Sequence, residues 1–486
     1  MIYEPIIGLE IHVEMKTASK MFSSAPYSFS KEPNTQVAPL DMAFPGTMPV
    51  VNKQAVVNGI RVAHALHMDI ERTLLFDRKN YFYSDLPKGY QITQEERPLG
   101  RHGYLTIVDA SGQEKRIGIE RLHLEEDTCK QLHMASYSLL DYNRAGVPLL
   151  EIVSLPEIRN GFEAMRYVEA IRNIVVYSGC SDGKMEEGSL RVDVNVSLRP
   201  QGEDSFGTKV ELKNLNSLRN IGLAIDYEIK RQAACLEGGI PISQETRRYD
   251  EASGQTVPMR IKSDAVDYKC FCESNLPPIA LSEGFIAEAI DTCPELYEGK
   301  KRRYLGLGLT PTDVAVILDD MDMARFFESA LAENEPKAIA NFLIVEINGY
   351  LNRRSISMAD LRLPPSSLCR IAAFQKEGYS HRQCVDILMY CLDHEGVTPE
   401  EAKAKLGIEK QISDEAAIRG YVTKAIAANP QSVADFFAGK DRAKGYLIGQ
   451  AMKLSGGKIH PAVCAKVMDE ELNQKSDNFT KKEEIA

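Results

Sequence analysis

Four segments in the first half of the chain alternate apolar residues with charged or polar ones, and this alternation constrains the fold more than any other feature. In residues 8–14 the polar positions are Glu10, His12 and Glu14. The other segments with this pattern are 121–125, 191–198 and 209–213. Successive side chains of a β-strand point to opposite faces, so each segment predicts a strand with one apolar and one polar face. If these strands share a sheet, carboxylates and basic groups converge on its polar face.

Two interpretations of this polar face stay open. An antiparallel sheet with one face in water produces the same alternation, and that interpretation fits any single strand taken alone. Three of the strands, however, carry Glu or Asp at a central polar position, and His12 lies between two carboxylates. Cations must offset the repulsion among such carboxylates, which indicates a metal site on a surface suited to the chemistry of phosphates.

The first part of the chain, to about residue 278, predicts an antiparallel α+β layer. Strand segments outnumber helical ones there, and few strands are separated by a helix long enough for a parallel crossover. Apolar residues at helical spacing predict helices over residues 162–175 and 218–229. Ser217 is placed to cap the second helix, and Gly238 and Gly239 to end it.

After about residue 292 helical signals dominate, and the 486 residues predict two to four domains in all. Residues 300–308 are expected to form a connector. Capping-box sequences beginning at Thr310, Ser380 and Thr398 mark helix starts beyond it, and a break near residues 407–413 divides this part. The expected parts are a sheet domain, a helical domain, a small helical tail domain and a disordered tail, at residues 1–293, 294–406, 407–475 and 476–486.

Composition excludes several classes of protein. No apolar run approaches the roughly 20 residues that span a bilayer, and the first residues lack the features of a secretory signal, so we expect a cytoplasmic protein without membrane contact. The ten cysteines lack the paired spacing of a disulfide framework or a Cys-rich zinc site, which favours reduced thiols. The net charge of −11 means that any nucleic-acid partner must be held by local patches.

The chain lacks the glycine-rich loops that commonly bind nucleotide phosphates. The Gly-Lys pair at residues 457–458 has neither the earlier glycine nor the following Ser or Thr of a phosphate loop. The Gly-Leu-Gly at residues 306–308 does not continue as a dinucleotide fingerprint. If the chain uses ATP, metal ions held by carboxylates must carry the triphosphate charge.

Two further segments are dense in functional groups. Residues 76–91 have no apolar period and predict a loop in which Lys79, Tyr81 and Lys88 are candidates to bind phosphate or an RNA end. The alternative is a surface loop whose tyrosines pack on the body of the protein. Glu151 lies inside an apolar run, where an unpaired carboxylate is costly, so we expect it to have a cation or a hydrogen-bond donor.

These segments, with residues 185–191, 245–247 and a motif spread over 449–461, closely resemble the B-subunit family of the aspartyl/glutamyl-tRNA amidotransferases, GatB. Several long motifs in the same order cover nearly the whole chain, which makes the resemblance specific. It implies an antiparallel-sheet cradle of the glutamine synthetase type, then an all-α helical domain and a small helical tail domain that contacts tRNA.

The resemblance also implies a function. Chains of this family work in a heterotrimer with an amidase, which is the A subunit, and with a small third chain, which is the C subunit. ATP, with Mg²⁺, phosphorylates the side-chain carboxylate of mischarged Glu-tRNA(Gln) or Asp-tRNA(Asn), and ammonia channelled from the amidase displaces the phosphate to give an amide. A carboxylate is a poor electrophile until its oxygen becomes a leaving group, so this chemistry depends on positioning and charge neutralisation.

Carried over by position, the resemblance assigns roles to particular residues. The metal ligands are His12, Glu125 and Glu151, with Glu10 and Glu211 close to a second ion or to the nucleotide. Glu10 and Glu125 thus count among the catalytic residues, together with the residues near the ammonia gate and the phosphates, which are Lys79, Tyr81 and Lys88. Further candidates for the cofactor-binding surface are Arg191, Asp193 and Asn195.

The sequence also departs from the family pattern. Some relatives hold zinc with four cysteines near the N-terminus, but residues 22–45 contain no cysteine, so no zinc is expected here. Where the family often has His-Asp-Tyr-Arg-Tyr-Phe-Pro-Glu-Pro-Asp, residues 266–275 of this chain are Val-Asp-Tyr-Lys-Cys-Phe-Cys-Glu-Ser-Asn. Smaller differences lie at residues 128–129 and 155–157. The proposed metal ligands survive these changes, so we expect catalysis to be kept.

Two other functions stay open at this point. The altered segment around Cys270 is compatible with a divergent tRNA-binding or assembly subunit that has little transferase activity. A third possibility keeps the ATP-dependent amide ligase chemistry but takes a free small carboxylate in place of the charged tRNA.

Overall fold

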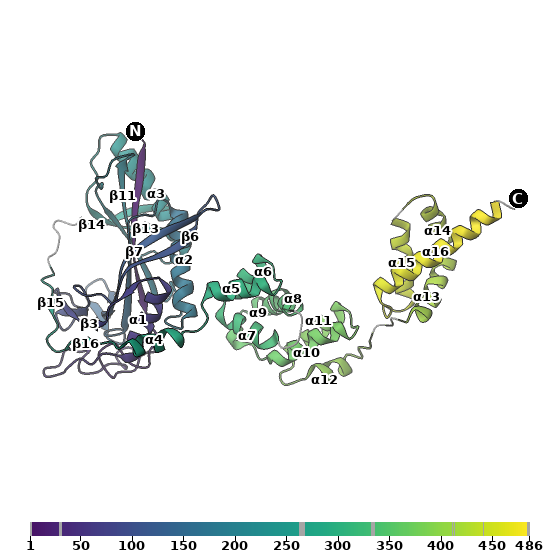
Figure 1. Cartoon of the computed structure of the whole chain (residues 1–486), viewed down its shortest axis with the longest axis horizontal. Helices are drawn as coiled ribbons and strands as arrows, with labels where there is room; N and C mark the ends of the chain where they lie inside the picture. Colours follow the sequence, from purple (N-terminus) through teal and green to yellow (C-terminus); the bar gives the residue numbers. More distant parts are fainter. Residues whose placement is uncertain are drawn as a thin grey trace. The chain divides into compact units, whose positions relative to one another are not determined.

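A computed structural model of the chain describes residues 2–28, 32–261, 268–331, 336–410, 412, 414–440 and 442–483. It divides into two compact units, Met1–Lys300 and Lys301–Ala486. The first unit is a mixed α+β layer and the second is helical, as Figure 1 shows. This outcome confirms the predicted change from a strand-rich part to a helical part along the chain.

A large sheet forms the framework of the first unit. Within the described residues its nine strands lie in the spatial order β14 (Gln255–Ile261), β13 (Glu245–Asp250), β12 (Val210–Lys213), β11 (Leu190–Pro200), β1 (Tyr3–Glu14), β10 (Pro148–Ser154), β7 (Glu114–Glu126), β6 (Gly100–Val108) and β2 (Asp69–Ile70). All neighbouring pairs are antiparallel except β12 and β13. The four alternating segments therefore form strands, as predicted, and these strands share one sheet, which is the condition for a common polar face.

The apolar face of this sheet is covered by three helices, α1 (Lys53–Ala65), α2 (Gly161–Tyr177) and α3 (Leu218–Glu237). Leu9, Ile11 and Val13 of β1 are each no more than 1% exposed and belong to the same core cluster as apolar residues of all three helices. Full burial of such a side chain stabilises the fold by about 1.5–3 kcal/mol, so this face fixes the register of the central strand. The polar residues of β1 are left on the opposite face.

The caps of the sheet-covering helices follow the sequence. The Ser217 side chain accepts a hydrogen bond from the backbone of Asn220, and α3 ends at Gly238 with Gly239 in the left-handed region (φ 71°). Both predictions are confirmed. Most of the helical spacing predicted for α2 is also confirmed: Val168, Ile171 and Val175 are fully buried. Phe162 is 42% exposed instead, and Tyr167, which the spacing did not include, is fully buried.

Three small sheets complete the first unit. They pair β15 (Phe271–Cys272) with β4 (Asp77–Asn80) and β4 with β5 (Tyr90–Thr93), β16 (Ile279–Ala280) with β3 (Thr73–Leu74), and β8 (Lys130–His133) with β9 (Ser138–Asp141). The prediction of a loop over residues 76–91 was therefore wrong at both ends. Strand pairing with β15, which is remote in sequence, gives β4 its structure although the segment has no alternation.

Helices build the rest of the chain. They are α4 (Glu283–Asp291), α5 (Tyr297–Gly306), α6 (Pro311–Asp319), α7 (Met321–Leu331), α8 (Pro336–Asn341), a π-helical turn (Phe342–Ile347), α9 (Asn348–Arg354), a 3₁₀ turn (Met358–Asp360), α10 (Pro365–Lys376), α11 (His381–Asp393), α12 (Pro399–Lys405), α13 (Glu415–Ala428), α14 (Pro430–Phe437), α15 (Arg442–Leu454) and α16 (Pro461–Glu483). The three predicted capping boxes, at Thr310, Ser380 and Thr398, are all present.

The predicted connector is a helix for most of its length. The boundary between the units falls at Lys300, inside the predicted connector, and residues 300–306 lie in α5. Lys and Arg are good helix formers, and Tyr304 buries its ring against Phe327 (ring centroids 5.0 Å apart), which gives the basic segment a packed face.

The end of the chain has its own small core, drawn from α13, α15 and α16. The predicted break lies between α12 and α13, as expected. The disordered tail predicted from residue 476 differs from the structure, in which the backbone of α16 stays helical to Glu483. A helix satisfies its own backbone hydrogen bonds and needs no buried partner to extend. Residues 484–486 lie outside the described part of the chain.

Two predictions from composition can also be compared with the structure. All ten cysteines lie in the described part of the chain, and none of them forms a disulfide, as expected. Among the described helices, none is both long enough and apolar enough to cross a bilayer.

Candidate active site

A transverse row of polar side chains crosses the central strands of the sheet. His12 of β1 lies directly opposite Glu151 of β10, which in turn lies directly opposite His123 of β7. The two imidazole Nε2 atoms approach the same oxygen of Glu151 from either side, at 3.2 Å and 3.5 Å. Direct opposition in the register places these side chains on one face, so the period-2 pattern of each strand accounts for the row.

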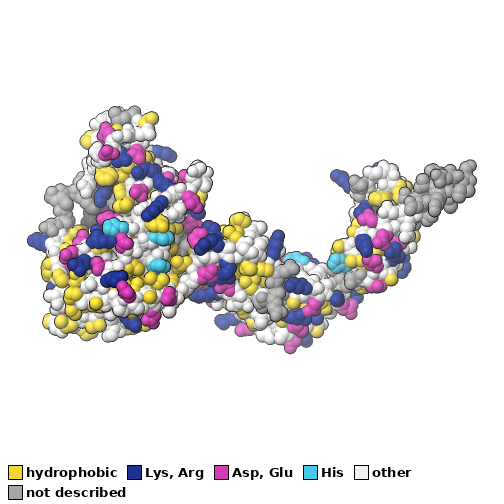
Figure 2. Space-filling model, viewed as in Figure 1, with side chains coloured by type: hydrophobic (Ala, Val, Ile, Leu, Met, Phe, Trp, Pro, Cys, Tyr) yellow, Lys and Arg dark blue, Asp and Glu magenta, His cyan; other side chains and the backbone are white. Residues whose placement is uncertain are grey.

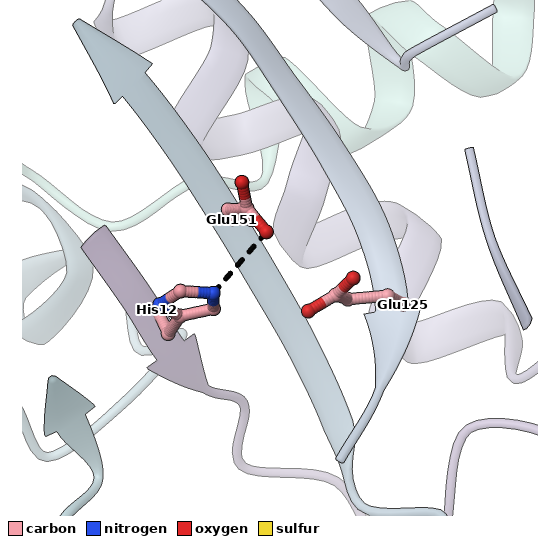
Figure 3. A group of neighbouring side chains, drawn as sticks. All are labelled: His12, Glu125 and Glu151. Carbon is pink, nitrogen blue, oxygen red and sulfur yellow. Dashed lines mark ion pairs between the residues drawn. The ribbon is translucent and has the colours of Figure 1, made fainter. Parts of the chain in front are cut away.

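Glu125, two residues after His123 on β7, completes the group. Its carboxylate lies 3.6 Å from His123 Nε2 and accepts a hydrogen bond from the Thr93 hydroxyl (3.1 Å). Figure 3 shows Glu125 and His12 pointing toward Glu151 from the two flanking strands. His12, Glu125 and Glu151 each offer a ligand atom, and these three atoms all lie within 4.8 Å of one another. The three residues that the sequence suggests as metal ligands are thus neighbours in space.

Burial and charge act against each other in this group. Burial lowers the pKa of His123, but the carboxylates of Glu151 and Glu125 outweigh it and raise that pKa to about 9. Burial also lowers the pKa of His12, and the hydrogen bond and charge of Glu151 reverse the shift. Burial raises the pKa of Glu151, whereas the two histidines hold it well below its usual range. Glu151 therefore has the cationic partners predicted for a carboxylate inside an apolar run.

A second group lies beside the row, around Arg191 of β11, which is directly opposite His12. Its guanidinium contacts Asp127 (2.5 Å) and Glu14 (3.9 Å), and Glu14 accepts a hydrogen bond from the Tyr27 hydroxyl (2.5 Å). Burial, followed by the charge of Asp127, raises the pKa of Glu14 to about 7. The positive charge of Arg191 therefore offsets the negative charge of these two buried carboxylates.

A third group holds the remaining acidic residues of the polar face. Asn195 donates to Glu10 (2.9 Å), and Glu10 lies outside the three-residue group of His12, Glu125 and Glu151. Lys213 contacts both Asp193 (2.5 Å) and Glu211 (3.3 Å). These residues come from β1, β11 and β12 and face the same side. Glu10 of β1 and Glu211 of β12 lie on the predicted polar face, but β10 separates both strands from β7, which carries Glu125.

The three basic and aromatic residues of the 76–91 segment occupy two different positions. Lys88 is held by both oxygens of the buried Glu126, each at 2.5 Å. Lys79 instead lies over the ring of Tyr268, with its Nζ 4.8 Å from the ring centroid, and the ring of Tyr81 packs edge-on against the same tyrosine. Burial raises the pKa of Tyr81, as does the charge of Asp85 and of Glu125, so its hydroxyl stays protonated near the carboxylates.

Charged side chains of both signs mix on the surface. On the face of the first unit that Figure 2 shows, Lys and Arg alternate with Asp and Glu, and histidines lie among them. The expectation that local patches would hold a nucleic-acid partner therefore stays a prediction.

The sequence did not single out several members of these groups. His123 shares the alternating segment of Glu125, so its position on the polar face was predicted, but its contact with Glu151 was not. Asp127 and Tyr27 give no periodic signal: Asp127 follows the end of β7, and Tyr27 comes from a loop. Of the altered segment 266–275, Val266 and Asp267 lie outside the described residues.

Comparison with known proteins identifies the family of the chain. A family model described as the GatB/GatE catalytic domain matches residues 5–287, and one described as the GatB domain matches residues 325–472. The chain is 45% identical over 477 residues to the B subunit of the aspartyl/glutamyl-tRNA(Asn/Gln) amidotransferase of Geobacillus thermodenitrificans (strain NG80-2), a match that covers 97% of this chain and 100% of that protein. It is 44% identical over 475 residues to the protein of the same name from Staphylococcus carnosus (strain TM300), with equal coverage. The chain therefore belongs to the GatB/GatE family.

Proposed function

We propose that this chain is the B subunit of a glutamine-dependent tRNA amidotransferase. In a heterotrimer with an amidase (the A subunit) and a small third chain (the C subunit), it phosphorylates the side-chain carboxylate of mischarged Glu-tRNA(Gln), Asp-tRNA(Asn) or both with ATP. Ammonia from the amidase then displaces the phosphate, and the product is Gln-tRNA(Gln) or Asn-tRNA(Asn). The relatives that match over their whole length carry this name, and the reaction takes place in the cytoplasm.

One observation carries the proposal beyond the family match. His12, Glu125 and Glu151 gather around one point although they are far apart in the sequence. Mg²⁺ is commonly held by one or two carboxylates, and Glu125 and Glu151 supply two, with the His12 imidazole as a third ligand, so this group can hold the ion. When bound, the ion would neutralise charge on the phosphates of ATP. His12 must be neutral to serve as a ligand, so ion binding would release a proton from this group.

The other residues of the polar face then take supporting roles. Glu10 and Glu211 lie nearer the nucleotide or a second ion, and Arg191, Asp193 and Asn195 shape the surface on which the nucleotide lies. Among the described residues Lys79 has no carboxylate within ion-pair distance, whereas Lys88 is held by Glu126 and Lys213 by Asp193. The Lys79 ammonium is therefore available to bind phosphate oxygens, as the proposal requires.

The proposal extends to the parts of the chain. The sheet of the first unit serves as the cradle of the glutamine synthetase type, over residues 1–293. The helices of residues 294–406 follow it. The small tail domain of residues 407–475, built around the core of α13, α15 and α16, contacts tRNA. The independent apolar core of that last part supports its assignment as a separate module.

The test is amidation by the reconstituted complex. The chain is combined with its amidase and its small third chain and supplied with mischarged tRNA, ATP, Mg²⁺ and glutamine. We expect amidated aminoacyl-tRNA and one ADP for each amide, measured by chromatography of the released amino acid and by a coupled ADP assay. Assembly of the complex without any amide product would contradict the proposal and leave a tRNA-binding or assembly role. Equal rates with a free glutamate or aspartate would favour the small-carboxylate ligase.

A further inference from the structure

A short segment after the large sheet returns to the active-site side of the first unit and pairs with β4. In the ladder between β15 and β4, Phe271 lies opposite Arg78 and Cys272 opposite Asp77. This pairing makes residues 268–276 the outer edge of the small sheet that carries Lys79. The segment falls within the run in which this chain departs from the family pattern.

Glu273 anchors this segment. Its side chain is fully buried and accepts two hydrogen bonds from the Arg78 guanidinium, at 2.6 Å and 3.0 Å. It also accepts one from the backbone of Asn275 (2.8 Å), and the Glu273 backbone donates to Phe76 (2.8 Å). A buried carboxylate with this many partners fixes the two segments to each other, because loss of either charge would leave the other unpaired.

The other end of the segment meets the functional side chains. The carbonyl of Tyr268 accepts a hydrogen bond from the backbone of Asn80 (3.0 Å), and the side chain of Asn80 donates to the carbonyl of Lys269 (2.8 Å). These bonds hold the Tyr268 ring where it contacts both the Lys79 ammonium and the Tyr81 ring. A lysine otherwise has many rotamers, so an aromatic ring under its ammonium restricts where the charge lies.

We infer that residues 268–276 form a positioning strap for the amidation reaction, with Glu273 as its anchor and Tyr268 as the residue that places Lys79 and Tyr81. The strap acts through these two side chains and does not touch the substrate itself. The inference rests on the proposed function, because it assigns a task to residues that the proposed reaction uses.

The changes in this segment leave the strap intact. Tyr268, Phe271 and Glu273 occupy positions at which the family run also has Tyr, Phe and Glu. The cysteines that replace Tyr and Pro, Cys270 and Cys272, are exposed. Lys269 and Asn275 also differ from the family run, but the hydrogen bonds of the strap described above use their backbone groups. The side chains that the strap uses are thus those that match the family run, which favours a working enzyme over a divergent assembly subunit.

The ring contact is tested with a pair of variants in the reconstituted heterotrimer. Tyr268→Leu removes the ring under Lys79, and we expect kcat/KM for ATP to fall about tenfold or more, because misplaced reacting groups cost rate. Tyr268→Phe keeps the ring and should stay within about twofold of the unchanged chain. The KM for tRNA should be unchanged in both, since the proposed task of Lys79 is to bind phosphate oxygens of ATP. Full activity of Tyr268→Leu, or equal loss in both variants, would overturn the inference.

The anchor is tested with Glu273→Gln and the matched control Cys272→Ser, which changes the neighbouring exposed residue. We expect Glu273→Gln to lower kcat/KM for ATP about tenfold, with the tRNA KM unchanged and the Cys272→Ser chain fully active. A uniform loss of activity and of thermal stability would mean a structural role only and would overturn the anchor assignment. If Glu273→Gln does not fold, the Tyr268 pair decides.

An unchanged chain that makes no amide contradicts the proposed function, whereas an active unchanged chain with fully active variants contradicts only the strap.

Discussion

Glu151 shows how a single residue reconciles folding with chemistry. It lies in the middle of an apolar strand with side-chain exposure of only 10%, where an isolated carboxylate would destabilise the fold. The imidazoles of His12 and His123 flank it and supply the compensating charge. A divalent cation bound to the same carboxylate would take over that compensation.

Removal of one ligand charge should separate catalysis from folding. In Glu125→Gln the side chain keeps its size and can still accept the hydrogen bond from Thr93. We expect ADP formation dependent on mischarged tRNA to fall about a hundredfold or more, because charge neutralisation at the phosphates is lost. The midpoint of thermal unfolding should change little. ADP formation at the original rate would count against the assignment of Glu125 as a ligand.

A buried pair away from the site offers a test of stability alone. Lys20 is fully buried, its ammonium lies 3.0 Å from Asp41, and it donates to the Tyr142 carbonyl. Lys20→Met leaves the Asp41 carboxylate buried without its cation, and we expect a loss of about 3–5 kcal/mol in the free energy of unfolding of the first unit. The double variant with Asp41→Asn should lose less, because no unpaired charge remains. Denaturant titration measures both, and equal losses would contradict this account.

At the scale of elements, the contact between α2 and α3 depends on two glycines. A Cβ at Gly161 would lie 2.4 Å from the carbonyl oxygen of Gly222 and 2.8 Å from its Cα. Gly161→Ala must therefore push the helices apart, and we expect a cost of about 1–3 kcal/mol. Gly284→Ala in α4 is the matched control: it also lies near a helix start, nothing is within 4 Å of its Cβ position, and it should be neutral or slightly stabilising. Thermal unfolding of the two variants decides, and equal midpoints would contradict the close-contact argument.

The elements that the sequence predicts are those with a strong local period. β1, β11 and α3 carry clear alternation or helical spacing with caps, and the structure has each of them. β4 was missed because it contains no apolar residue, and β5 because its alternation covers only four residues. Their structure comes from the pairing of β4 with β5 and of β4 with β15. Pairing between distant segments leaves no trace in the spacing of either one.

The same distinction holds for the candidate site. The alternation of apolar and polar residues placed His12 and Glu125 on the polar face, and the energetic cost of burying a carboxylate predicted partners for Glu151. The register between paired strands decides which residues lie opposite each other, and no single segment encodes it. The opposition of Arg191 to His12, of His12 to Glu151 and of Glu151 to His123 is therefore known only from the fold. The strap could not be predicted from the sequence either, because it depends on the pairing of β15 with β4, which are far apart in the chain.

At the scale of the whole molecule, the last helices should be needed for tRNA and not for the fold of the rest. The core of α13, α15 and α16 uses only residues after 411. We expect a chain that ends at Leu406 to assemble with its partners and to show a rise of about tenfold in the KM for mischarged tRNA, with the KM for ATP unchanged. Steady-state kinetics measures both. An unchanged tRNA KM would remove the tRNA role of these helices and favour a small-carboxylate substrate.

The position of β1 in the middle of the sheet bears on how the chain is made. This strand is synthesised before both of its hydrogen-bonding neighbours, β10 and β11, which end only at Ser154 and Pro200. At about 5–20 residues per second, roughly ten to forty seconds of translation pass before both neighbours exist. During that time the nascent strand exposes two unpaired edges and an apolar face, so its early synthesis calls for protection by a chaperone.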